Sequence, residues 1–316
     1  MTNAQYAPSL PIRRLAEKPW FVWPNLGISV HGNSNEINRG RLSAVELPLF
    51  LAPTNLTMSR FGNLEFNDDS SHQLEPEPKP LVKDEAHFLA EARTAFESGN
   101  FEPGLRFYSK VLEYNPNNAA AWTGQVRMLI ELGEYREAKL WADKALERFP
   151  NEPELLAAKA VALGRSGDLD GAMSFSDASI EERGDTPYVW LARGDVLLAR
   201  SETRADYCFE KALLLAPRDW LIAWLAARIR FYYEQFALAL KLIQQAVEWN
   251  PGHFLLWLEQ GHCQQALGLV GPAELSFTQA KQLNPSCDAA GQALLRISQT
   301  GPLARLRGKL RSLFKR

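Results

Sequence analysis

Histidine and cysteine are the side chains of this chain whose chemistry would suit catalysis or metal binding. The chain holds five histidines and three cysteines, and only His262 and Cys263 are neighbours in sequence. Adjacent residues of a helix point in different directions, so this pair does not make a metal site. The glycine spacings match neither a phosphate-binding loop nor a dinucleotide-binding fingerprint. We therefore expect no enzymatic activity, no metal and no cofactor.

The composition excludes several further classes of protein. The chain has 316 residues, a formal charge of −2, 46% hydrophobic residues and 23% charged residues. It contains no run of about 20 apolar residues, so we expect no membrane-spanning helix. The near-neutral charge argues against nucleic-acid binding driven by bulk charge. The small, odd number of cysteines predicts reduced thiols and a cytoplasmic protein.

The last segment, residues 300–316, combines basic residues with leucines at helical spacing. Its leucines are Leu303, Leu306, Leu310 and Leu313. Its basic residues are Arg305, Arg307, Lys309, Arg311, Lys315 and Arg316, and it contains no acid. This pattern predicts a short basic amphipathic helix. Three readings stay open: the leucines pack on the rest of the chain, the helix lies on an anionic membrane surface, or it contacts an acidic partner or nucleic acid.

A repeat governs the middle of the chain. Prolines stand at Pro116, Pro150, Pro217, Pro251 and Pro285, with differences of 34, 67, 34 and 34, and Gly184 fills the missing step. We number each unit from 1 with the proline at position 32, so that unit 1 begins at Glu85. Position 4 holds a large residue in most units: Phe88, Trp122, Leu156, Trp190 and Trp257. Positions 8, 20 and 27 hold small residues in most units, so the period and the residue sizes repeat together.

This pattern resembles the tetratricopeptide repeat family over residues 85–285, about two-thirds of the chain. The resemblance implies an all-α fold, a right-handed superhelical solenoid of about six helix-turn-helix units. We expect a capping helix at 286–299, followed by the basic tail at 300–316. Before the repeats, residues 67–84 read as an acidic, proline-containing linker. Residues 1–66 read as an N-terminal segment whose fold the sequence does not define, with a small β-hairpin as one reading.

In tetratricopeptide arrays the first helices line a concave groove that binds partners, and the resemblance implies the same here. The expected groove residues occupy positions near 2, 5, 9 and 12 of the units. They are Arg93, Arg127, Tyr188, Leu191, Asp195, Trp224, Arg228, Leu255, Leu258 and His262. Such a groove would suit a peptide or protein with apolar and acidic residues. The competing reading is that these residues mainly pack against the chain or meet solvent.

Two units depart from the repeat. In unit 4 the second helix fits a frame one residue shorter than the first, so the turn at Arg200–Arg204 has lost a residue. In unit 5 position 4 is Ala223, and the tryptophan stands one place later, at Trp224. Either the helix is rotated or a slip occurs near residues 231–233.

The predicted function is a protein–protein interaction scaffold or adaptor that holds a partner in the concave groove. The alternative is a peripheral membrane or complex-assembly adaptor anchored by the basic tail. The sequence identifies neither the partner nor the oligomeric state.

Overall fold

The computed structural model describes residues 84–299, and in this range the chain is entirely helical, with thirteen α-helices. Six helices are the first members of helical pairs: α1 (Glu85–Glu97), α3 (Ala119–Glu131), α5 (Pro153–Ser166), α7 (Pro187–Ala199), α9 (Trp220–Tyr232) and α11 (Phe254–Ala266). Their second members are α2 (Phe101–Tyr114), α4 (Tyr135–Arg148), α6 (Leu169–Glu181), α8 (Ala205–Leu215), α10 (Phe236–Trp249) and α12 (Val270–Leu283). The helix α13 (Asp288–Gln299) follows the last pair. The predicted all-α solenoid of six units with a final helix is confirmed.

Several predictions fall outside the described residues. These are the hairpin within residues 1–66, the linker up to residue 83, and the basic tail with its membrane-surface reading. They stay predictions. Among the helices that the structure does describe, none is long and apolar enough to cross a bilayer.

Local sequence explains where the helices begin. Four first helices have a side-chain cap, in which an oxygen of Asp84, Asn118, Thr186 or Asp219 accepts a hydrogen bond from a backbone N–H of the first turn. The helices α5 and α7 begin with a proline, whose missing N–H costs nothing in a first turn. The starts of these first helices are thus determined by capping residues and prolines that can be read from the sequence.

The turn inside each pair needs one residue with a left-handed backbone. Four units place glycine there: Gly99, Gly133, Gly167 and Gly268. In unit 4 the residue is Ser201 (φ 60°), and in unit 5 it is Glu234 (φ 59°). A side chain raises the energy of this conformation, so units 4 and 5 carry strain that the other units avoid.

The tryptophans at position 4 share one arrangement. The indole N–H of Trp122 donates to the carbonyl of Pro116 at 3.0 Å, and that of Trp257 donates to the carbonyl of Pro251 at 2.7 Å. Where Gly184 replaces the proline, Trp190 donates instead to the Asp185 carboxylate at 2.9 Å. Each tryptophan therefore ties its helix to the end of the preceding unit.

Small residues let the two helices of a unit approach each other. A Cβ on Gly261, at position 8, would lie 2.5 Å from the ring of Phe277, and one on Gly194 would lie 2.8 Å from the ring of Phe209. Both distances are impossible for real atoms, so the aromatic residue of the second helix requires glycine opposite it. The pattern of small and large residues is thus a description of close packing.

Units 4 and 5 depart from the array in different ways. Five second helices begin three residues before their small residue, as α2 does with Phe101 and Gly104, but α8 begins at its small residue, Ala205. Unit 4 has therefore lost the first turn of its second helix. In unit 5 the interval from the start of α9 to the start of α10 equals that in the regular units, so no slip occurs. Ala227 remains buried in its usual place, so the helix is not rotated either.

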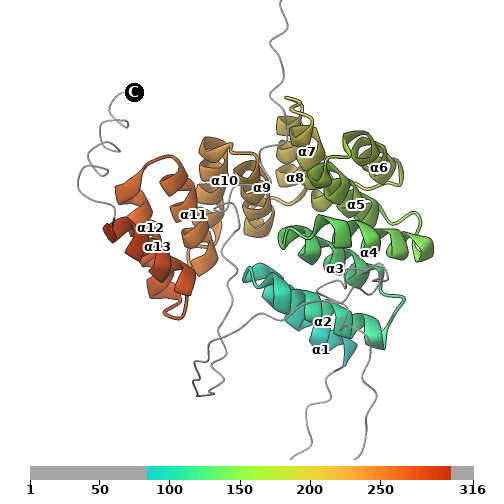
Figure 1. Cartoon of the computed structure of the whole chain (residues 1–316), viewed down its shortest axis with the longest axis horizontal. Helices are drawn as coiled ribbons and strands as arrows, with labels where there is room; N and C mark the ends of the chain where they lie inside the picture. Colours follow the sequence, from blue (N-terminus) through green and yellow to red (C-terminus); the bar gives the residue numbers. More distant parts are fainter. Residues whose placement is uncertain (1–83, 300–316) are drawn as a thin grey trace, which may run out of the picture.

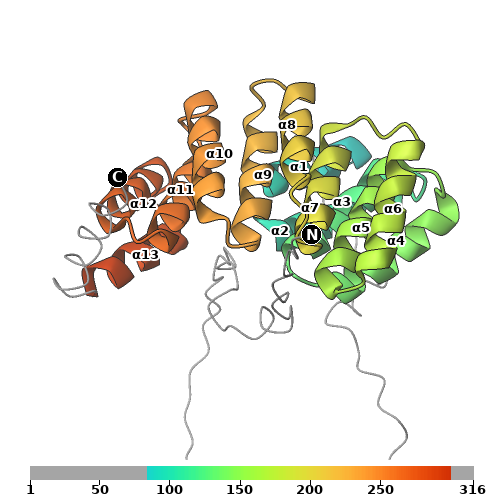
Figure 2. The same ribbon diagram turned by 90° about the horizontal axis from the view of Figure 1, so that it is seen from above.

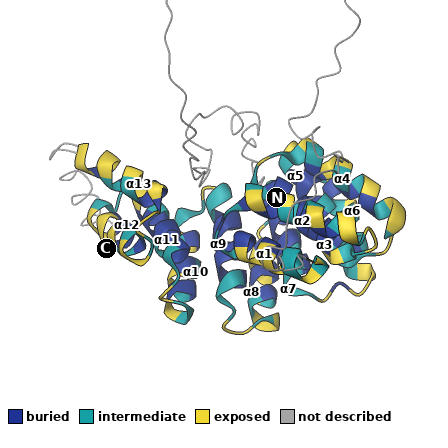
Figure 3. Ribbon diagram, turned by 90° about the horizontal axis from the view of Figure 1, so that it is seen from below, coloured by how far each residue is buried: buried dark blue, intermediate teal, exposed yellow. Residues whose placement is uncertain are grey.

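The array bends so far that its beginning meets its fifth unit. The helices α1 and α2 lie beside α9, although more than 100 residues separate them in sequence (Figures 1 and 2). Buried residues gather on the sides of the first helices, and second helices such as α4 and α6 carry exposed residues (Figure 3). One large core cluster joins buried residues of all six units, and a second, small cluster lies between units 3 and 4.

Candidate functional site

The ten residues predicted to line the groove all lie on first helices, on a side that we call the inner face. Six of them are buried: Leu191, Asp195, Trp224, Arg228, Leu255 and Leu258. Arg127, Tyr188 and His262 are half-buried, and Arg93 is exposed. Most of these side chains thus contact other parts of this chain. Their contact with a partner stays a prediction.

The inner face is covered where unit 5 meets units 1 and 2. The indole of Trp224 has 0% exposure; it packs edge-on to Phe96, with ring centroids 5.9 Å apart, and is stacked on Phe101 at 6.5 Å. Arg228 donates from Nε to Oε2 of Glu131 at 3.0 Å, across 97 residues of sequence. We call this set of contacts, made by Trp224 and Arg228 with Phe96, Phe101 and Glu131, the closure. Trp224 stands at position 5 instead of position 4. It therefore contacts unit 1 in the closure instead of the end of the preceding unit.

Arg228 lies between the carboxyl groups of Glu131 and Glu259, which differ in their pKa values. Its Nη1 donates to Oε1 of Glu259 at 3.0 Å, on the side away from Glu131. Burial raises the pKa of Glu259 to about 8, and Arg228 only partly offsets this effect. Burial also acts against ionised Glu131, but Arg228 and Arg165 outweigh it and hold the Glu131 pKa below its ordinary value. At neutral pH, Glu131 is therefore the anion that balances Arg228, and Glu259 is mostly protonated.

A second polar cluster lies on the inner face of units 3 to 5. Arg165 donates from Nη2 and Nε to Oδ2 of Asp195, at 2.6 and 3.1 Å. Tyr233 donates its hydroxyl to the other oxygen of Asp195 at 2.7 Å. Nearby, the guanidinium of Arg127 lies 3.9 Å from the ring centroid of Tyr188, a cation–π contact. Together these groups give the inner face buried charges that are paired by hydrogen bonds.

Four participants in these clusters are absent from the sequence prediction: Glu131, Arg165, Tyr233 and Glu259. Glu131 and Arg165 stand at position 13, one turn after position 9, on the same side of the helix. A charged residue at that position in an otherwise apolar helix was the available signal. Tyr233, just after the end of α9, and Glu259, at position 6 of unit 6, had no comparable signal, because neither stands at a position that the repeat places on the inner face.

The neighbouring pair His262 and Cys263 is not arranged for metal chemistry. Burial lowers the pKa of His262 to about 4 and raises the pKa of the Cys263 thiol. The imidazole is therefore neutral and the thiol is protonated at neutral pH. Within residues 84–299, no group of three or more His, Cys, Asp or Glu side chains is placed to hold a metal ion.

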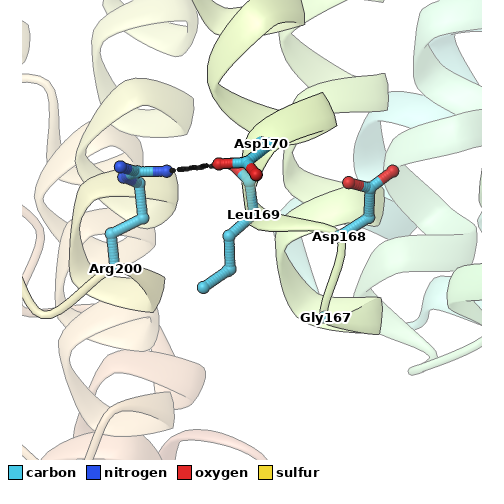
Figure 4. Close-up of a pocket in the computed structure, with 5 residues that line it drawn as sticks. All are labelled: Gly167, Asp168, Leu169, Asp170 and Arg200. Carbon is cyan, nitrogen blue, oxygen red and sulfur yellow. Dashed lines mark hydrogen bonds and ion pairs between the residues drawn. The ribbon is translucent and has the colours of Figure 1, made fainter. Parts of the chain in front are cut away.

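An open hollow of about 450 Å³ lies where the turn between α5 and α6 meets the end of α7 (Figure 4). It is lined by Gly167, Asp168, Leu169, Asp170 and Arg200. The Arg200 guanidinium lies 3.3 Å from the Asp170 carboxylate. Asp168 caps α6 by accepting from the backbone N–H of residue 171. The polar groups that line this hollow thus serve the turn and the contact between units 3 and 4.

Comparison with known proteins agrees with this architecture. A family model described as "Tetratricopeptide repeat" matches residues 95–162, which run from the end of α1 into α5. The period, the six helical pairs and this match together show that the chain contains tetratricopeptide repeats and has their helical-pair fold. It therefore has the general architecture of a protein-interaction scaffold. No curated protein matches it in sequence.

Several solved structures are similar to parts of the chain. A tetratricopeptide repeat protein from Parabacteroides merdae has a TM-score of 0.46 at 17% identity, over 70% of this chain and 87% of that one. TTC0263, from Thermus thermophilus, has a TM-score of 0.46 at 20% identity, over 57% of this chain and 99% of that one. The Cut9–Hcn1 hetero-tetramer of APC/C has a TM-score of 0.42 at 16% identity, over 73% of this chain. The chain spans about half (53%) of the length of that last structure.

Proposed function

We propose that this protein is an interaction scaffold whose inner face receives a partner segment with acidic and apolar residues. The observation that carries the proposal is the gathering of arginines and aromatic rings on that face. Arg127 lies over the rings of Phe96 and Tyr188, and Arg228 lies over the ring of Trp224. Arg165 lies over the ring of Tyr232. Arginine and large aromatic residues dominate the binding energy of protein interfaces.

Stacking of the repeats does not require these residues. The units stack through the large and small residues at positions 4, 8, 20 and 27, which recur along the array. Buried ion pairs stabilise a fold little better than apolar residues of the same volume, because desolvation opposes their attraction. Charged residues on the inner face are therefore better explained by recognition of a partner than by stability.

Arg93 gives the sharpest test, because it lies on the inner side of α1 and is exposed. The tagged full-length chain and its Arg93→Glu variant would be cross-linked in cells, purified and analysed by mass spectrometry. We expect a partner that is cross-linked to first helices and captured at least several-fold less by Arg93→Glu. The control is Arg106→Glu, the same charge reversal at an exposed arginine of α2.

Circular dichroism should show equal helicity for the three proteins. Equal capture of the partner by Arg93→Glu and Arg106→Glu would contradict the proposal. Cross-links confined to second helices would contradict it as well.

A further inference from the structure

The closure occupies the surface on which the proposed function depends. Trp224 and Arg228 are the aromatic and basic residues of α9 on the inner face, and they contact units 1 and 2 of the same chain. Trp224 has 0% exposure and Arg228 has 7%. A partner can reach these two side chains only when the closure separates.

The closure is a contact between two parts that are otherwise joined along the array. One part is units 1 to 4, and the other is α9 to α13. Because α1 and α2 reach α9 directly, the two parts meet both at the α8–α9 joint and at the closure (Figure 1). Separation of the closure therefore requires bending at a joint between units 2 and 5, and the α8–α9 joint is one of these.

The α8–α9 joint is built less firmly than the joints before it. At position 11, units 2 to 4 bury leucines: Leu129, Leu163 and Leu197. Unit 5 places Arg230 there, with 5% exposure. Arg230 lies over the ring of Phe209 and is paired with Asp206 of α8, but its Nε has no hydrogen-bond partner in the described part of the chain.

A buried guanidinium with an unsatisfied N–H weakens the contact around it. The second helix of unit 4 also lacks its first turn, and Ser201 and Arg218 hold left-handed backbones on either side of α8. Among the joints of units 2 to 5, the α8–α9 joint is thus the weakest, and bending there would separate the closure.

We propose that the closure regulates the inner face: α9 to α13 turn about the α8–α9 joint, and the partner binds the form in which the closure is open. This regulation rests on the proposed function of the inner face. In the closed form, Glu131 and the rings of Phe96 and Phe101 occupy the positions next to Arg228 and Trp224. An acidic and apolar partner segment replaces them when it binds.

The opening itself can be measured without a partner. Spin labels on Arg106→Cys of α2 and Leu275→Cys of α12 would report the distance between the two parts by pulsed electron resonance. Both sites are exposed, and the three native cysteines are buried, so the labels go to the added thiols. We expect a single distance in the parent and a second, longer population in Glu131→Gln, which removes the charge that balances Arg228.

A matched control is Glu113→Gln, the same change on α2 in a surface ion pair with Lys110. It should show the parent distance. If Glu131→Gln also keeps the single parent distance, the proposed opening is wrong.

A second readout uses a native thiol. Cys263 lines the same small void as Trp224, Arg228 and Glu259, and it is 2% exposed. Its alkylation by N-ethylmaleimide, followed by mass spectrometry, should be about tenfold faster in Glu131→Gln if the closure opens locally. The rate at Cys287, which lies beside α13, should not change. Equal acceleration at both thiols would indicate general unfolding and would overturn the local opening.

The partner experiment separates this inference from the proposed function. The partner whose capture depends on Arg93 should be captured several-fold more by Glu131→Gln than by the parent. Equal capture by these two proteins would overturn the regulation and leave the proposed function standing. Absence of any Arg93-dependent partner would overturn the proposed function, and the regulation with it.

Discussion

The regular units and the closure use tryptophan in different ways. In units 2 and 6, Trp122 and Trp257 stand at position 4, are tied to a proline carbonyl six residues earlier, and hold adjacent units together. Trp224 stands one position later in unit 5 and packs on rings from unit 1. A shift of one residue thus converts a local contact into a long-range contact, because it turns the side chain by about 100° around the helix.

The two regions also differ in polarity. The joints among units 1 to 3 are held by leucines, alanines and aromatic rings. The closure, the α8–α9 joint and the contact of Arg165 with Asp195 contain buried arginines with carboxylate partners. An apolar joint is stabilised by close packing, which pH and salt affect little. The stability of a charge pair depends on pH and on competing ions. We therefore expect the regular units to be the rigid part of this array, and the closure to be the part that solution conditions and ligands change.

The largest expected effect comes from truncating the two kinds of tryptophan. Trp224→Ala should lower the free energy of unfolding by about 3–5 kcal/mol, because it leaves a cavity in a fully buried aromatic cluster. Trp257→Ala should cost less, because that side chain is only half-buried. Urea denaturation followed by circular dichroism measures both.

Hydrogen exchange shows where each truncation acts. Trp224→Ala should speed exchange in α1 and α2 as well as in α9, and Trp257→Ala should affect only units 5 and 6. If the two variants show the same pattern, the distinction between stacking and closing tryptophans is wrong.

A smaller effect on the free energy of unfolding should follow from deprotonation of Glu259 as the pH rises. Its pKa in the folded protein, about 8, lies above that of an unfolded glutamate, so the folded state binds more protons between these values. The resulting stabilisation is present at low pH and is lost as the pH rises through about 8. Between pH 7 and 8, we expect Glu259 to account for a loss of about 1 kcal/mol in the free energy of unfolding.

The variant Glu259→Gln isolates this contribution from the histidines and thiols, whose pKa values are also shifted by burial. Urea denaturation at pH 7 and pH 8 should show a smaller loss for the variant than for the parent. An identical pH dependence in both proteins would mean that Glu259 is ionised in the folded state at neutral pH.

The smallest effect concerns the turns. Ser201→Gly should stabilise the protein by about 0.5–1 kcal/mol, because glycine adopts the left-handed backbone of that turn without strain. The reverse change in a regular unit, Gly133→Ser, should destabilise by a similar amount, since no atom lies within 4 Å of the added Cβ. Thermal unfolding of the two variants measures the pair. Changes of the same sign would show that backbone strain does not distinguish these turns.

The sequence contained most of the information on the regular units. The proline spacing located the six units, and the small residues at positions 8 and 20 identified where helices touch. These features are local and repeated, so each unit supports the reading of the next. The lost residue in the turn of unit 4 was visible for the same reason.

The closure was visible only as an irregularity. The displacement of Trp224 stood out, but its partners Phe96 and Phe101 lie in unit 1, and no local pattern specifies how far an array bends. Arg228 was expected on the inner face, but the carboxylates that pair with it come from units 2 and 6. Small angles between successive units determine these contacts, and those angles arise from packing that a periodicity does not describe.

The contact between Arg228 and Glu131 has one more consequence, for the number of repeats. An open solenoid can gain or lose a unit and keep every remaining interface, so its length is free to vary. Here the curve from unit 2 to unit 5 must return α9 to α3, and one inserted or deleted unit would carry the arginine away from its carboxylate. The ion pair between Arg228 and Glu131 can therefore form only with the present number of repeats between units 2 and 5.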